Sequence, residues 1–275
     1  MTIDSAIRNS PKIQLRFKMN MKTNKTSYTP DSPDILVSGR DITVSFADRS
    51  EKRTTVLDGL DFDIYKGEIL GLAGESGSGK STLAKTILGM VKYDSGKLYV
   101  GADKPQMIFQ DPYSSLNPAK KISWIMQEPL RLGTNMDKSA RKQKVSEMLS
   151  SVGLNNEIGD HKPNELSGGQ RQRVCIGTAL MRNPELLIAD EPVSALDVTV
   201  QAQVLELMKE LHEKHGFTML FISHDLRTMY NFCDRIMILQ KGKIVESGRP
   251  DELYRNPQAE YTKLLLESAG ITVSH

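Results

Sequence analysis

The stretch Gly74-Glu75-Ser76-Gly77-Ser78-Gly79-Lys80-Ser81 decides the fold of this chain. It satisfies the pattern G-x-x-x-x-G-K-[ST], and it stands between the apolar run 69–73 and the helical stretch 81–90. In such a strand–loop–helix setting, successive backbone N–H groups face a concavity that accepts phosphate oxygens, and the helix directs its positive end at them. The stretch therefore predicts a phosphate-binding loop within an α/β fold.

The residue types of this loop each suit that prediction. The glycines allow positive φ angles and a close approach of the backbone to phosphate. Lys80 should reach the β- and γ-phosphates, and Ser81 should ligate Mg²⁺ through its hydroxyl. A chance glycine-rich turn is the alternative, and the flanking strand and helix argue against it. The residues that we expect to bind nucleotide here are Gly74, Glu75, Ser76, Gly77, Ser78, Gly79, Lys80, Ser81 and Thr82.

A second strand, further along the chain, ends in acidic residues. Residues 186–189 are apolar, and Asp190 and Glu191 follow them directly. We expect Asp190 to hold Mg²⁺ and Glu191 to polarise the attacking water. An acidic cluster at a helix N-terminus would look the same in isolation, but the phosphate loop upstream favours the metal site. Together the two motifs predict a P-loop nucleoside triphosphatase.

Strands and helices alternate along the rest of the chain. Residues 198–215 carry apolar side chains along one helical face, and residues 112 to about 165 are mainly helical, with good helix formers over 138–152. This alternation predicts an α/β sheet with buried parallel strands, and it makes the helical region an inserted subdomain. The predicted strands are 35–37, 42–46, 56–64, 69–73, 106–109, 186–189, 218–223 and 235–239.

Composition narrows the classes of protein that fit. No stretch approaches the roughly 20 apolar residues that a helix needs to cross a bilayer. The two cysteines, Cys175 and Cys233, cannot by themselves hold a structural zinc or an iron–sulfur cluster, and we expect them to be buried and reduced.

Residues 1–33 hold six basic and two acidic residues, which leaves 30 basic against 32 acidic residues in the remainder. We therefore expect no binding of nucleic acid. Residues 1–33 are predicted to be a flexible basic leader, with contact to anionic lipid as the alternative.

The stretch Leu166-Ser167-Gly168-Gly169-Gln170 points to a family. It matches the LSGGQ signature, and the chain therefore resembles the ATP-binding cassette (ABC) ATPases. A serine N-cap is the alternative for Ser167, although a cap does not explain two glycines followed by glutamine. The other motifs stand in the order that this family has. By resemblance, Gln110 contacts Mg²⁺ and the attacking water, Asp197 belongs to the D-loop and His224 is the switch histidine at the γ-phosphate.

Phe46 lies 28 residues before Gly74, about where the same family has an aromatic residue that stacks on adenine. A core position in a strand is the alternative for Phe46. Further stretches are similar to the peptide/nickel (oligopeptide and dipeptide) importer ATPases: 108–118, 190–198 with 201–205, and 256–257 with 261–265. The resemblance covers residues 34–268. It implies a mixed sheet with an antiparallel β subdomain, a helical subdomain inserted at about 112–165, a C-terminal segment at about 248–268 and a tail at 269–275.

This resemblance also implies a function. The chain would be the ATP-hydrolysing subunit of an importer, peripheral on the cytoplasmic face of the membrane, with ATP and Mg²⁺ as cofactors. Two ATPase subunits would pair head to tail, as a heterodimer or alternatively a homodimer, each ATP lying between one phosphate loop and the other subunit's residues 167–170. Two transmembrane permease subunits and an extracytoplasmic solute-binding protein would complete the system. The cargo would be peptide, or nickel or another chelated metal; a non-transport ABC ATPase acting on a soluble macromolecular partner is the alternative.

Overall fold

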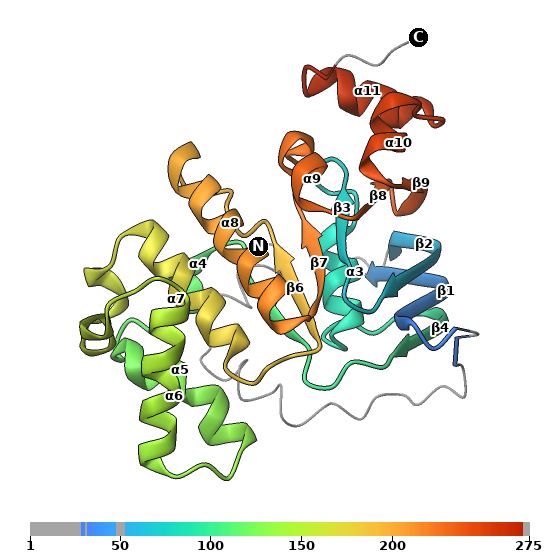
Figure 1. Ribbon diagram of the computed structural model, residues 1–275. Coiled ribbons are helices and arrows are strands. Elements are labelled where there is room, and N and C mark those ends of the chain that lie inside the picture. The colour runs from blue at the N-terminus through green and yellow to red at the C-terminus, as the bar shows by residue number, and fades with distance from the viewer. Residues whose placement is uncertain (1–28, 31, 48–52, 272–275) are drawn as a thin grey trace. The chain divides into compact units, whose positions relative to one another are not determined.

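The computed structural model describes residues 29–30, 32–47 and 53–271 (Figure 1). Most of the predicted leader and most of the predicted tail lie outside these residues. The described chain divides into two compact units. One is formed by the residues up to Gln110 together with those from Asn183 onward, and the other by Asp111–Arg182.

The larger unit contains a six-stranded sheet with the order β5-β6-β7-β3-β8-β9. Its neighbouring strands are parallel except for β8 and β9, which are antiparallel. Strands β3, β6 and β7 are buried along their whole length, which explains their continuous apolar sequences. The carboxyl ends of these three strands meet at one edge of the sheet. The strands are β3 (Ile69–Ala73), β5 (Gln106–Ile108), β6 (Leu186–Asp190), β7 (Thr218–Ile222), β8 (Arg235–Gln240) and β9 (Lys243–Gly248).

A separate antiparallel sheet has the order β2-β1-β4, with β1 at Ile35–Ala47, β2 at Arg53–Tyr65 and β4 at Ser95–Val100. The two strands predicted at 35–37 and 42–46 are one strand. Its register against β2 shifts near Asp41, whose φ of 53° interrupts the alternation of side chains. Strand β4 was not predicted, because its apolar residues are confined to the short run Leu98–Val100, and none of its residues is buried.

The main core of this unit lies between the two sheets. Helix α3 (Lys80–Ile87) adds Leu83, Ala84 and Ile87 to it, together with buried side chains from β1, β2, β3, β6, β7 and β8. On the other face of the parallel strands, α8 (Val198–His215) and α9 (Leu226–Phe232) lie toward the viewer in Figure 1. There the rings of Phe221 in β7 and Phe232 in α9 are 4.7 Å apart. The central strands are therefore covered on both faces.

The helical unit comprises α4, α5, α6 and α7 with two short 3₁₀ helices. Helices α5, α6 and α7 contact one another. A Cβ added to Gly177 of α7 would lie 3.1 Å from Met126 of α5 and 3.2 Å from Met148 of α6, so glycine permits this close packing. The unit runs to Arg182 and includes α7, whereas the sequence interpretation ended the insertion near residue 165. The elements are α4 (Pro112–Ser115), α5 (Ile122–Gly133), α6 (Lys138–Ser151), η1 (Asn156–Asp160), η2 (Pro163–Glu165) and α7 (Gly168–Leu180).

The C-terminal segment forms α10 (Pro250–Arg255) and α11 (Glu260–Ser268). It is bound to α9, since the Tyr254 hydroxyl donates to the Leu226 carbonyl and Arg227 Nε donates to the Ala269 carbonyl over 3.1 Å. Within the described part of the chain, no helix combines the length and the apolar character needed to cross a membrane.

The cysteines are not disulfide-bonded. Cys233 follows α9 and is buried, and this burial raises the pKa of its thiol. Cys175 lies on α7 and keeps partial exposure.

Candidate active site

The phosphate loop joins the end of β3 to the start of α3. Gly74 has φ 148°, and a Cβ there would lie 2.1 Å from the Leu239 carbonyl oxygen in β8, so a larger residue does not fit. Gly79 is the N-cap of α3 with φ 112°, and no described side chain caps this helix end. A helix leaves its first N–H groups without intrahelical partners, and its N-terminus carries partial positive charge. The amides of Lys80, Ser81 and Thr82 are therefore suited to bind an anion.

Lys80 folds back onto the loop. Its Nζ donates hydrogen bonds to the carbonyl oxygens of Gly74, over 2.7 Å, and Glu75, over 2.8 Å. Burial lowers the pKa of Lys80, while the charges of Glu191 and Asp190 act in the opposite direction. The loop thus holds a cationic group against its own backbone, within reach of a ligand that would enter it.

Ser78 contributes a hydroxyl to the same loop. Its Oγ is buried and has no hydrogen-bond partner among the residues that the structure describes. A buried hydroxyl without a partner costs about 1–3 kcal/mol, and such a group in a native protein calls for an explanation. A phosphate oxygen bound in the loop would supply the missing partner.

Asp190 ends β6 and faces Ser81 in the first turn of α3. Burial raises the pKa of Asp190, and the Ser81 hydroxyl acts in the opposite direction. No group of three or more metal-ligating side chains occurs in the described ranges. The single carboxylate of Asp190, with Ser81 nearby, fits Mg²⁺, which is usually held by one or two carboxylates together with substrate phosphates and water.

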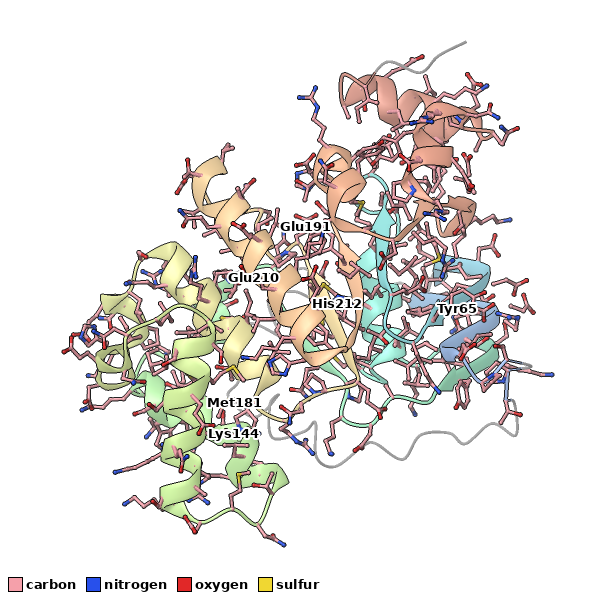
Figure 2. The ribbon with its side chains drawn as sticks, in the orientation of Figure 1. Tyr65, Lys144, Met181, Glu191, Glu210 and His212 are labelled. Atoms are coloured by element: carbon pink, nitrogen blue, oxygen red, sulfur yellow. The ribbon has the colours of Figure 1, made fainter. Side chains whose placement is uncertain are left out.

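Two polar side chains converge on Glu191, which follows β6 and is labelled in Figure 2. Gln110 Nε2, from the end of β5, donates to Glu191 Oε2 over 3.1 Å. His224 Nδ1, just after β7, lies 3.4 Å from Glu191 Oε1. Glu191 also has φ 46°, a left-handed conformation that is uncommon for residues other than glycine and that concentrates at functional sites. The three residues that the sequence assigns to hydrolysis therefore lie together.

The signature stretch starts α7 in the helical unit. Ser167 Oγ accepts from the Gln170 N–H over 3.3 Å, and Gln170 Oε1 accepts from the Ser167 N–H over 2.9 Å. This is a complete capping box. The interpretation that a cap leaves Gln170 unexplained was wrong, because Gln170 closes the box. The capping box does not explain why Gly168 and Gly169 are glycines. Leu166, which precedes the box, is buried.

Two other predicted site residues have local structural roles. Asp197 is the N-cap of α8, and its Oδ1 accepts from the Val200 N–H over 3.0 Å. Phe46 is partly buried in β1 and packs against the core between the sheets. Residues 48–52, which follow Phe46 closely, lie outside the described residues, so its contact with adenine stays a prediction.

Sequence reasoning did not assign a role to Tyr261 of α11, whose hydroxyl accepts a hydrogen bond from the N–H of Glu75 over 3.1 Å. The signal that could have found it is the C-terminal stretch 261–265, which we noted only as a family feature. The structure therefore adds this residue to the phosphate loop's surroundings.

Known proteins share much of this sequence. Residues 57–194 match the family model described as ABC transporter. The oligopeptide transport ATP-binding protein OppF of Bacillus subtilis is 47% identical over 229 residues, which cover 77% of this chain and 75% of that protein. The dipeptide transport ATP-binding protein DppF of Escherichia coli is 42% identical over 233 residues, which cover 79% and 70%.

A solved structure is similar as well. It is the dimeric structure of the ATP-binding cassette MJ0796 in a post-hydrolysis state, bound to ADP and Pi. It has a TM-score of 0.70 and 29% sequence identity, and the match covers 78% of this chain and 99% of that chain. The predicted fold class, a P-loop domain with a mixed sheet, an antiparallel β subdomain and helices inserted between strands, is confirmed.

Proposed function

Because this chain belongs to the ABC transporter family as one of its ATP-binding ATPases, we propose that it hydrolyses ATP to drive the uptake of peptides. The convergence of Gln110 and His224 on Glu191, beside the phosphate loop, carries the proposal of hydrolysis. The proposed cargo rests on relatives that are named for oligopeptide and dipeptide transport and are 42% to 47% identical. Nickel or another chelated metal is the alternative cargo, and the names of these relatives do not mention it.

In the proposed reaction, Lys80 exchanges its two carbonyl partners for phosphate oxygens. The first amides of α3 and the Ser78 hydroxyl bind phosphate oxygens as well, and Phe46 stacks on the adenine. Mg²⁺, when bound, neutralises charge on the phosphates, and Ser81, Asp190 and Gln110 are the residues that would hold it.

Glu191 polarises the attacking water by accepting its proton, and Gln110 orients the Glu191 carboxylate. His224, which is the more exposed member of its pair with Glu191, approaches the γ-phosphate. The strained backbone of Glu191 supports this assignment, since it fixes the carboxylate at the end of β6.

The complete site is proposed to need a second ATPase subunit. ATP would lie between this phosphate loop and the signature residues of the partner, while Leu166 to Gln170 and Asp197 of this chain would serve the partner's nucleotide. The dimeric state of the similar cassette supports pairing. We propose a heterodimer rather than a homodimer, on the cytoplasmic face of the membrane. It would bind two permease subunits and act with an extracytoplasmic solute-binding protein, the partners that peptide uptake through a membrane requires.

Hydrolysis is tested with Glu191→Gln, measured in the complex with the partner ATPase and permease. This variant should bind ATP and hold the closed dimer, while turnover falls about 10²- to 10³-fold, as expected when a general base is removed. Glu206→Gln, an exposed change of the same kind on α8, should keep normal turnover. Near-normal turnover in Glu191→Gln would falsify the catalytic role of Glu191.

Cargo is tested separately, by reconstituting the complex in vesicles and measuring ATP-dependent uptake. A labelled oligopeptide should accumulate, and radiolabelled nickel should not. Accumulation of nickel without accumulation of peptide would overturn the peptide assignment and leave the ATPase assignment intact.

A further inference from the structure

Tyr261 of α11 contacts the phosphate loop, although 186 positions separate it from Glu75. We propose that Tyr261 is a positioning residue for ATP: by accepting the Glu75 N–H, it fixes the phosphate loop in the shape that binds nucleotide. This inference rests on the proposed function, in that the loop binds ATP. It gives the C-terminal segment a part in the nucleotide site.

The peptide groups of Glu75 are held from both sides. Its carbonyl oxygen accepts hydrogen bonds from Lys80 Nζ, over 2.8 Å, and from the Ser78 N–H, over 3.2 Å. Its N–H donates to Tyr261. When Lys80 turns to a phosphate group, Glu75 loses one of these bonds. The bond to Tyr261 involves neither Lys80 nor the first amides of α3, and it is therefore kept when those groups turn to phosphate.

Gly74 makes such an anchor useful. With φ 148° it has a backbone conformation that glycine alone adopts readily, and glycine is also the residue with the most conformational freedom. Glu75 is the first residue after this glycine, and it is exposed, whereas Gly74 itself is buried. A hydrogen bond at the Glu75 N–H restricts the loop where it leaves the buried backbone, and this lowers the conformational entropy that ATP binding must remove.

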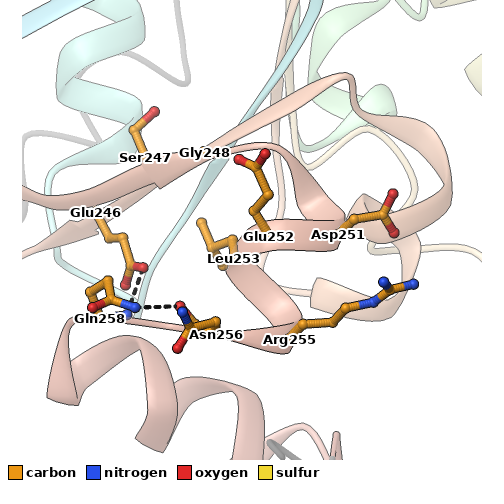
Figure 3. A pocket seen from close by; sticks show the side chains of 9 residues that line it. All are labelled: Glu246, Ser247, Gly248, Asp251, Glu252, Leu253, Arg255, Asn256 and Gln258. Carbon is orange, nitrogen blue, oxygen red and sulfur yellow. Dashed lines mark hydrogen bonds between the residues drawn. The ribbon is translucent and has the colours of Figure 1, made fainter.

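Strand β9 places α11, and thereby Tyr261. The carboxylate of Glu246 in β9 accepts from the N–H of Gln258, over 2.8 Å, and of Ala259, over 3.0 Å. Ala259 is the N-cap of α11, and its own side chain offers no cap, so Glu246 supplies the negative charge that a helix N-terminus favours. Figure 3 shows Glu246 against Gln258, at a cavity of about 420 Å³ beside α10. Thr262, next to Tyr261, is fully buried. Tyr261 is thus fixed by the sheet.

The test compares Tyr261→Phe with Tyr254→Phe in the full chain. Tyr254 belongs to the same C-terminal segment and bonds a backbone carbonyl of α9, away from the loop. In calorimetric titration with Mg²⁺ and ATP, Tyr261→Phe should weaken binding about threefold to tenfold, the loss expected when ATP must itself order about one backbone residue of the loop. Tyr254→Phe should lower the melting temperature and leave ATP affinity unchanged. With the partner subunits, Tyr261→Phe should raise KM for ATP while kcat stays near the wild-type value.

A local measurement separates positioning from folding. Hydrogen exchange of the Glu75 amide, followed by NMR, should be faster in Tyr261→Phe and unchanged in Tyr254→Phe. If the wild-type chain binds ATP and Tyr261→Phe matches it in KM and in Glu75 exchange, the inference is wrong. It is also wrong if both variants weaken ATP binding alike, because Tyr261 then acts only through the fold. A wild-type chain that does not bind ATP would instead refute the proposed function.

Discussion

Helices α3 and α7 both begin at predicted anion sites, but they begin differently. Helix α3 starts at Gly79 in a left-handed conformation, and no described side chain caps it. Helix α7 starts at Ser167, where a capping box with Gln170 satisfies the N–H groups of both residues. One helix end is thus left open, and the other is closed by its own side chains.

This difference indicates that the two helix ends have different roles in nucleotide binding. The open end of α3, with Lys80 and a Ser78 hydroxyl that has no partner within the described part of the chain, suits primary binding of phosphate. The end of α7 is stable without a ligand. The amides of Gly168 and Gly169 lie outside the box, and no side chain of their own covers them. We infer that these glycines, which a cap does not explain, keep two donors accessible to the nucleotide of a partner subunit.

Lys80→Ala should have the largest effect, because it removes the cation from the open site. ATP binding by the isolated chain should fall below detection, and ATPase activity of the complex should fall by about 10²-fold or more, comparable to the loss of a key charge-stabilising donor. Lys92→Ala, an exposed change just after α3, is the control. Retained ATP affinity in Lys80→Ala would contradict the assignment of α3 as the primary site.

Gln170→Glu separates the two roles of the α7 end. Glutamate closes a capping box as well as glutamine does, and a negative charge there favours the helix, so the melting temperature should not fall. The same charge should repel the partner's nucleotide. ATPase activity of the complex should drop about tenfold, which corresponds to about 1.4 kcal/mol, while ATP affinity of the isolated chain stays unchanged.

Gln203→Glu, an exposed change on α8, is the matched control for added charge. Normal ATPase activity in Gln170→Glu would reduce Gln170 to a structural cap. Weaker ATP binding by the isolated chain would show instead that the α7 end acts within its own subunit, and the comparison of primary and partner sites would fail.

Elements with a strong local pattern were predictable from the sequence. Strands β3, β6 and β7 are buried on both faces, so their apolar runs mark them directly. Helix α8 was predicted with its observed bounds from its apolar face. In the structure Asp197 caps one end, and Gly216, in a left-handed conformation, ends the other. The phosphate loop was visible because its glycines and lysine are consecutive.

Features that depend on distant contacts were not predictable. Strands β4 and β9 are partly exposed, and pairing with neighbours, which the sequence does not display, defines them. Gln110 and His224 were placed at one site with Glu191 only through the family resemblance, because their approach depends on three strands ending at one edge. The contact between Tyr261 and Glu75 depends on the carboxylate of Glu246 at the start of α11. Such side-chain hydrogen bonds follow from the packed fold and leave no periodic pattern.

Asp190→Asn should have the smallest effect on the fold, and it tests the carboxylate that faces the open end of α3. Burial raises the pKa of Asp190, so folding is favoured below the unfolded-state value of 3.8 and this contribution is lost as pH rises through the folded-state pKa. Asparagine has nearly the same shape and stays neutral at every pH. The variant should therefore melt slightly above the wild type at neutral pH, and the difference should vanish below pH 3.8, while Mg²⁺-dependent ATPase activity falls.

Asp63→Asn is the control, and its expected change in melting temperature at neutral pH has the opposite sign. Burial acts to raise the pKa of Asp63, but hydrogen bonds from Arg40 and Ser38 outweigh it and lower the pKa, so that variant should be less stable at neutral pH. An Asp190→Asn protein that melts below the wild type at neutral pH would mean that the ionised carboxylate stabilises the fold, and that the site does not hold it against a desolvation cost.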